Sequence, residues 1–135
     1  MSLEFSQRER EGIHILDLKG RLTAGEEVGK LREKLQQMSA AGQVNVILNL
    51  QDIDFIDSTG LGALVVCFMT LKKAGGALKL LNLSKRTVEL LVLTKLSTVF
   101  EMHGDEQDAV NSYFPGREIR KFDILNFVQK RKEAG

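Results

Sequence analysis

A short apolar run in the middle of the chain constrains the fold more than any other feature of the sequence. Five of the seven residues from 44 to 50 are Val, Ile or Leu, and the run begins shortly after Gly42. It is rich in β-branched residues and too continuous for a strand with one face in water. We therefore expect residues 44–50 to form a central, buried strand.

The segments on either side of this run alternate between strand and helix patterns. Residues 13–18 place apolar side chains between two glycines, which predicts a strand paired with residues 3–9. From Glu26 to Ala40, apolar residues recur every three or four positions, which predicts an amphipathic helix. The further elements predicted in this way are a helix at 58–74, a strand at 77–81, a helix at 85–96, a strand at 99–102 and a helix at 105–113.

The order of these elements predicts an α/β protein. Strands that alternate with helices favour a sheet that is at least partly parallel, and the opening strand pair supplies an antiparallel edge. We therefore expect a mixed sheet of four or five strands with about four helices packed against it. The chain of 135 residues has the size of a single domain, which we place at residues 1–114.

The last part of the chain, residues 115–135, is predicted to be a helical extension. Pro115 and Gly116 break the chain, and Asp123 opens an amphipathic segment with basic residues at its end. We expect its apolar side chains to dock on the domain, while a homodimer contact, a partner contact and attachment to a membrane surface stay open as alternatives. These apolar side chains are Phe122, Ile124, Leu125, Phe127 and Val128, and the basic ones are Lys130, Arg131 and Lys132.

The overall composition excludes several classes of function. The formal net charge of +1 offers no basic surface for nucleic acid, so we expect no nucleic-acid partner. No apolar run approaches the roughly 20 residues that span a bilayer, and the start of the chain has no signal core, which predicts a cytoplasmic protein without membrane insertion. Cys67, His14 and His103 lack the spacing of a metal site, and no catalytic pattern is present. We expect no cofactor, no metal and no enzymatic activity.

A polar corner follows the buried strand and is the best candidate for a functional site. Residues 52–62 read Asp-Ile-Asp-Phe-Ile-Asp-Ser-Thr-Gly-Leu-Gly and lead from the strand into the helix at 58–74 through a predicted turn. Ser58 is expected to cap this helix, its hydroxyl accepting from the amide of Gly60 or Leu61. The cap alone explains a serine, but acidic neighbours at Asp54 and Asp57, together with the hydroxyl of Thr59, favour a further role.

The helix at 58–74 carries two apolar stripes instead of one. Leu61, Leu64, Val65, Phe68 and Leu71 form the stripe expected to face the sheet, and Gly62, Val66, Met69 and Lys73 form a second one on another side. Since glycine disfavours helix, Gly60 and Gly62 suggest steric clearance for an approaching partner. The second stripe is either a partner surface or is buried under a neighbouring helix.

The motif at this corner resembles the signature of the STAS domain family. The sequence Asp-Ser-Thr-Gly-Leu-Gly follows an apolar strand and is preceded by Asn49-Leu50 and by Phe55. Residues 18–22 before the first helix, and Gly75-Gly76 with residues 78–83 after the second, extend the resemblance over residues 3–113. The resemblance implies a STAS fold and, for a free-standing bacterial chain of this length, an anti-sigma factor antagonist.

The resemblance also implies a mechanism. Such a protein binds an anti-sigma factor that is also a serine kinase, and so releases a sigma factor. The kinase, which brings its own ATP, switches the antagonist off by phosphorylating the motif serine, here Ser58, and a serine phosphatase is a further candidate partner. The residues expected to contact the partner are Thr23, Asp54, Asp57, Ser58, Thr59, Gly60, Gly62, Val66 and Met69.

One departure from the family pattern and one alternative accompany this prediction. Many relatives carry an acidic residue where this chain has Thr23, a difference that bears on phosphorylation efficiency or partner choice. The alternative is a STAS subunit of another signalling assembly, or a lipid- or nucleotide-binding module that serves a transporter.

Overall fold

The fold was obtained as a computed structural model that describes residues 3–120, 122–125 and 127. Its sheet has five strands in the order β1-β2-β3-β4-β5, and β1 runs antiparallel to β2 while the other neighbours are parallel. The predicted α/β architecture with a mixed sheet is confirmed. The strands are β1 (Leu3–Arg10), β2 (Ile13–Leu22), β3 (Asn45–Ile56), β4 (Ala77–Leu81) and β5 (Glu101–His103), and the α-helices are α1 (Glu26–Ala40), α2 (Ser58–Lys73), α3 (Lys85–Leu93) and α4 (Glu106–Asn111).

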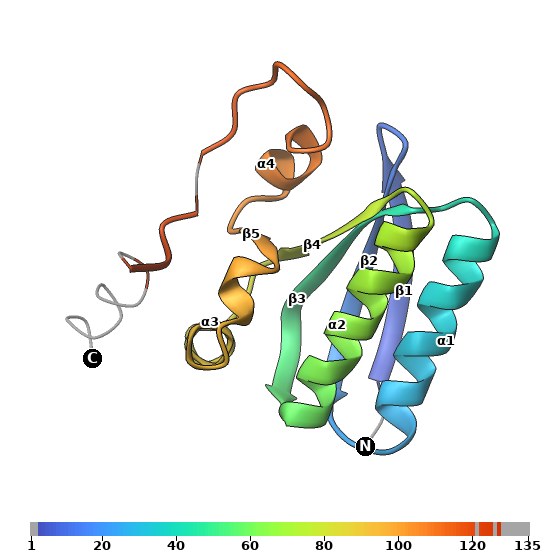
Figure 1. The fold of residues 1–135 in the computed structure, drawn as a ribbon, viewed down its shortest axis with the longest axis vertical. Coiled ribbons are helices and arrows are strands. Elements are labelled where there is room, and N and C mark those ends of the chain that lie inside the picture. Colours follow the sequence, from blue (N-terminus) through green and yellow to red (C-terminus); the bar gives the residue numbers. More distant parts are fainter. Residues whose placement is uncertain (1–2, 121, 126, 128–135) are drawn as a thin grey trace.

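The main core lies beneath α1 and α2, which run side by side over one face of the sheet (Figure 1). The apolar stripe of α1 is buried as its periodicity predicts, and α2 adds Leu61, Leu64 and Leu71. Beneath them, β3 contributes the fully buried Val46 and Leu48. The run at 44–50 is therefore the buried central strand that its composition predicts.

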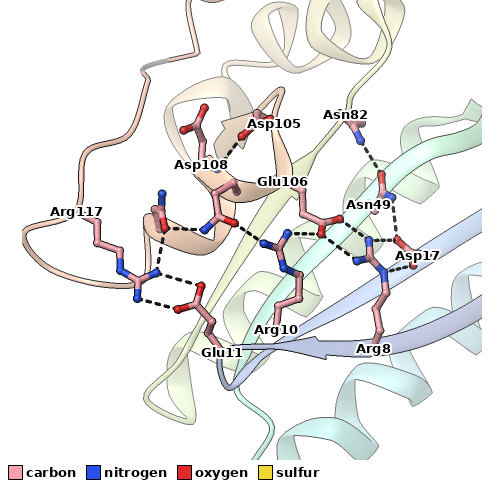
Figure 2. Close-up of polar contacts among 12 residues, drawn as sticks. Arg8, Arg10, Glu11, Asp17, Asn49, Asn82, Asp105, Glu106, Asp108 and Arg117 are labelled. Atoms are coloured by element: carbon pink, nitrogen blue, oxygen red, sulfur yellow. Dashed lines mark hydrogen bonds and ion pairs between the residues drawn. The ribbon is translucent and has the colours of Figure 1, made fainter.

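The short helix α4 covers part of the opposite face of the sheet. Its Ala109 and Val110 pack in a second apolar cluster with Ile13, Ile15 and Ile47. A row of charged side chains fastens the helix from the side, because Arg8 and Arg10 of β1 both bind the carboxylate of Glu106 (Figure 2).

This charged row continues across the sheet. The guanidinium of Arg8 also donates to both oxygens of Asp17 on β2, at 2.6 and 3.0 Å. Asp17 accepts from Asn49 of β3 at 2.8 Å, and Asn49 accepts from Asn82, just beyond β4, at 3.2 Å (Figure 2). The face of the sheet next to α4, which we call the back of the sheet, is therefore polar, and its polar side chains are paired with one another.

Several predicted boundaries were wrong by a few residues. β2 and β3 extend well beyond 13–18 and 44–50, because their parallel pairing continues past irregularities in register as far as Leu22 and Ile56. Asp52 and Asp54 therefore belong to β3 and not to a turn. Near the other end of the chain, α3 stops at Leu93, a short 3-10 helix occupies Leu96–Thr98, and β5 begins at Glu101 instead of residue 99.

The C-terminal segment docks on the domain. The side chains of Phe122, Ile124 and Phe127 are half-buried against the main core, and the Phe127 amide donates to the Asp123 carbonyl at 2.9 Å, as in a helical turn. Leu125 points away and is 68% exposed. Val128 and the basic residues 130–132 lie outside the described residues, and the division of the chain after residue 114 stays a prediction.

Candidate functional site

The N-terminus of α2 is capped by Asp57, so the prediction that Ser58 caps it was wrong. Asp57 has extended backbone angles, and one of its carboxylate oxygens accepts from the Gly60 amide at 2.8 Å. Both Asp and Ser are good caps. The choice depends on where β3 stops, and because β3 continues to Ile56, the helix takes Ser58 as its first residue.

The carboxylate of Asp57 also ties α2 to the loop between β2 and α1. Its second oxygen accepts from the amide of Ala24 at 3.0 Å, while the Asp57 amide donates to the carbonyl of Leu22 at 3.3 Å. The amides of Ala24 and Gly60 hold the pKa of Asp57 below its usual range. A carboxylate that is ionised at neutral pH therefore lies next to Ser58, and the fold engages both of its oxygens.

Ser58 and Thr59 project from the first turn of α2 into solvent. Both residues are exposed, and within the described part of the chain neither hydroxyl has a hydrogen-bond partner. The Ser58 hydroxyl is thus neither buried nor engaged in the cap that the sequence suggested. An enzyme that modifies hydroxyl groups can reach it without any part of the fold opening.

The two glycines of α2 have different neighbours, and the predicted reason for Gly60 was wrong. Gly60 is buried, and a β-carbon there would lie 2.1 Å from the carbonyl oxygen of Leu22. Gly60 therefore allows α2 to approach β2, and it does not face a partner. At Gly62, an added β-carbon would meet nothing within 4 Å, so this glycine does lie on an open surface.

The second stripe of α2 is exposed. Val66 is 38% and Met69 51% exposed, and both Gly62 and Lys73 belong to the exposed surface. The alternative of burial under a neighbouring helix was therefore wrong among the described residues. We call this stripe (Gly62, Val66, Met69 and Lys73) the α2 ridge.

The structure brings only some of the predicted partner-binding residues together. Thr23 lies in the loop that Asp57 holds, where its hydroxyl donates to Glu27 at 3.3 Å. Asp54 is exposed near the end of β3. Met69 is farther away, because the rise of a helix puts it about 16 Å from Ser58 along the axis.

A cluster around Phe55 was missed by sequence reasoning. The Arg21 guanidinium carbon lies 5.9 Å from the centroid of the Phe55 ring, and that of Arg86 lies 5.1 Å from it. The cluster borders an open groove at the end of the sheet lined by Glu4, Lys19, Gly20, Arg21, Gln51, Asp52, Asp54 and Phe55. Pairing of residue 21 with residue 55 in the strand register is the signal that could have found it.

The described residues give little support for a reactive cysteine, a metal site or a membrane-spanning helix. Burial raises the pKa of the Cys67 thiol to about 12, which makes it a poor nucleophile. No group of three or more His, Cys, Asp or Glu side chains is arranged for a metal ion in the part of the chain that the structure describes. No helix among the same residues is both long and apolar enough to cross a bilayer.

The matches found by comparison with known sequences agree with one another. Residues 4–109 match the family model of the STAS domain. The anti-sigma-B factor antagonist of Bacillus subtilis is 39% identical over 80 residues, which cover 59% of this chain and 72% of that protein. The protein of the same name from Listeria monocytogenes is 29% identical over 106 residues, which cover 78% of this chain and 91% of the relative.

Comparison with solved structures supports the same fold. An anti-sigma factor antagonist from Mycobacterium paratuberculosis superposes with a TM-score of 0.69 at 18% identity, covering 82% of this chain and 92% of that one. The phosphorylated form of the Bacillus cell fate determinant SpoIIAA gives a TM-score of 0.63 at 22% identity, covering 82% and 99%. With the predicted resemblance confirmed over most of its length, the chain belongs to the STAS domain family.

Proposed function

We propose that this protein is an anti-sigma factor antagonist whose binding to an anti-sigma factor kinase is switched off by phosphorylation of Ser58. The observation that carries the proposal is the unengaged, exposed hydroxyl of Ser58 at the start of the helix that bears the α2 ridge. The sequence relatives from Bacillus subtilis and Listeria monocytogenes are named anti-sigma-B factor antagonists, which supports it. The protein acts as a binding regulator and not as a catalyst.

The arrangement of charges suits such a switch. A phosphoserine adds about −1.5 to −2 charge and three acceptor oxygens at the first position of α2. The helix N-terminus tolerates this charge locally, so the fold persists. The neighbouring Asp57 is ionised and has both oxygens engaged, so it cannot turn away and it repels the phosphate.

The effect of the phosphate falls on the interface. A partner surface that fits a neutral serine must desolvate the new charge without pairing it, which costs about 2 to 5 kcal/mol. This corresponds to an affinity about 30-fold to several thousand-fold lower. SpoIIAA, which shares the fold, is known in a phosphorylated and an unphosphorylated form. A serine phosphatase acting on Ser58 would restore binding.

The test combines phosphorylation and binding. The anti-sigma factor kinases of the same organism are purified, and each is incubated with the protein and ATP, followed by peptide mass spectrometry. We expect phosphate on Ser58, no phosphate in Ser58→Ala, and normal phosphorylation in the control Ser6→Ala, which removes an exposed hydroxyl from β1. In binding assays without ATP, Ser58→Ala should bind like wild type and Ser58→Asp should not. Equal binding by the Asp and Ala variants would show that Ser58 is not the switch.

A further inference from the structure

Two arginines share one aromatic ring at the end of the sheet next to Ser58. Arg21 comes from β2 and Arg86 from the first turn of α3, and both contact the half-buried Phe55 of β3. Both arginines are exposed, and within the described residues neither forms an ion pair or hydrogen bond through its guanidinium group. We call these three residues the Phe55 cluster.

The charge of Arg21 is not balanced by cross-strand neighbours, in contrast to that of Lys19 in the same groove. Lys19 lies opposite Glu4 of β1 and Asp52 of β3 in the register, so carboxylates flank it on both sides. Arg21 lies opposite Phe55, and the described part of β1 ends before reaching it. Asp54 lines the groove but forms no ion pair with either arginine in the described structure.

The position of Arg86 adds to the unbalanced positive charge. A helix N-terminus carries a partial positive charge, so a cation in the first turn is unfavourable there. The first turn of α3 has no acidic residue, and its other cation, Lys85, pairs with Glu89 at 3.6 Å. Two guanidinium groups therefore share one aromatic ring beside a helix N-terminus, and the ring offsets a small part of the repulsion between them.

The two guanidinium groups lie near the Phe55 ring while their N–H donors stay available. Guanidinium donors pair best with carboxylate groups, often through two hydrogen bonds. The groove beside the cluster is open, which suits a side chain presented by another protein. Since α2 begins three residues after Phe55, a partner that covers Ser58 also reaches the cluster.

From these observations we infer that the Phe55 cluster is a second contact for the kinase partner and receives Asp or Glu side chains of that protein on Arg21 and Arg86. The inference rests on the proposed function, since it extends the same interface from the α2 ridge around the end of the sheet. The cluster supplies attraction and orientation, whereas Ser58 supplies the switch.

Charge reversal tests the inference. The Kd for the anti-sigma factor kinase that phosphorylates Ser58 is measured for wild type, Arg21→Glu, Arg86→Glu and the double variant, with Arg32→Glu as the matched control. Arg32 is exposed on α1 and does not belong to the Phe55 cluster. We expect each single reversal to raise Kd about tenfold, the double reversal about 100-fold, and the control less than about twofold. Added salt should weaken wild type more than the double variant.

Three outcomes would overturn the inference, and they separate it from the proposed function. If both arginine variants bind like Arg32→Glu while Met69→Asp loses binding, the cluster is not a contact although the antagonist function stands. If wild type binds none of the organism's anti-sigma factor kinases, the function fails and the inference fails with it. If millimolar inorganic phosphate saturably shifts the Nε–H resonances of Arg21 and Arg86, the cluster serves a small anion instead.

Discussion

The inner and outer sides of α2 carry the same types of residue in different surroundings. On the inner side, Gly60 lies against the Leu22 carbonyl and Leu64 is fully buried. On the outer side, Gly62 faces open space and Met69 is half exposed. Glycine and apolar side chains in this helix therefore serve packing where a neighbour is present and are available for binding where none is.

The back of the sheet provides a third case for this comparison. Around α4, the charged side chains of Arg8, Arg10 and Glu106 are exposed or half-buried, like those of the Phe55 cluster, yet they are paired with one another (Figure 2). Paired charges hold α4 to the sheet, so they are not available to a partner. Four substitutions test the distinction between groups engaged by the fold and groups left open.

Gly60→Ala should have the largest effect. The new methyl group would lie 2.1 Å from the Leu22 carbonyl oxygen, which belongs to the paired backbone of β2 and cannot move away without cost. We expect the free energy of unfolding to fall by about 3 kcal/mol. Urea unfolding followed by circular dichroism measures it. A loss below about 1 kcal/mol would mean that α2 shifts outward easily and that the close approach is not needed.

Met69→Asp should damage binding and spare stability. The side chain is 51% exposed, so an aspartate there keeps most of its hydration in the free protein but is desolvated against an apolar partner surface. We expect binding to the anti-sigma factor kinase to weaken about 30-fold, or about 2 kcal/mol. The matched inner variant Leu64→Asp should not fold. Loss of the thermal unfolding transition in Met69→Asp, as expected for Leu64→Asp, would place the ridge in the core.

Glu106→Gln should affect stability, in a way that depends on pH, and leave binding unchanged. A hydrogen bond from Arg8 and, to a smaller extent, one from Arg10 lower the pKa of Glu106 from 4.5 to about 2 in the folded protein. The carboxylate therefore stabilises the fold fully above pH 4.5, and this contribution is lost as the pH falls towards 2. The partly exposed ion pairs limit it to about 1 kcal/mol at neutral pH.

The measurement for Glu106 is denaturant unfolding of both proteins between neutral and acidic pH. Wild type should be the more stable protein at pH 7, and the difference should shrink on acidification below pH 4.5. A gap that stays constant down to pH 2 would mean that the Glu106 charge does not hold α4.

The sequence was sufficient for those features that depend on local pattern. Periodicity located the core residues of α1, and the continuous apolar composition identified β3 as a buried strand. The motif after β3 indicated the family, the fold and the corner that carries Ser58. The α1 stripe and the buried strand are each encoded within about 15 neighbouring residues, and the family resemblance rests on the motif together with the order of the flanking elements, so no knowledge of distant contacts was needed.

The remaining features depend on residues that are far apart in the chain. Asp57 and Ser58 are equally good caps by type, and pairing of β3 with β2 decided between them. The role of Gly60 follows from Leu22, which is 38 positions earlier. The Phe55 cluster combines three separate elements, and each of its residues alone looks like an ordinary surface side chain. Strand register is therefore the missing information.

Gly62→Ala should have the smallest effect, opposite in sign to that of Gly60→Ala. Its methyl group would enter open space, and alanine is favoured over glycine in a helix, so we expect a gain of about 0.5 to 1 kcal/mol in the free energy of unfolding. On the outer side, the same methyl group protrudes from the α2 ridge towards the partner. The affinity for the anti-sigma factor kinase should therefore fall a few-fold. Opposite signs for the two glycines would establish that the inner one is fixed by packing and the outer one by the partner. A loss of stability in Gly62→Ala would show instead that a neighbour covers the ridge in solution, and the distinction between the two sides of α2 would then fail.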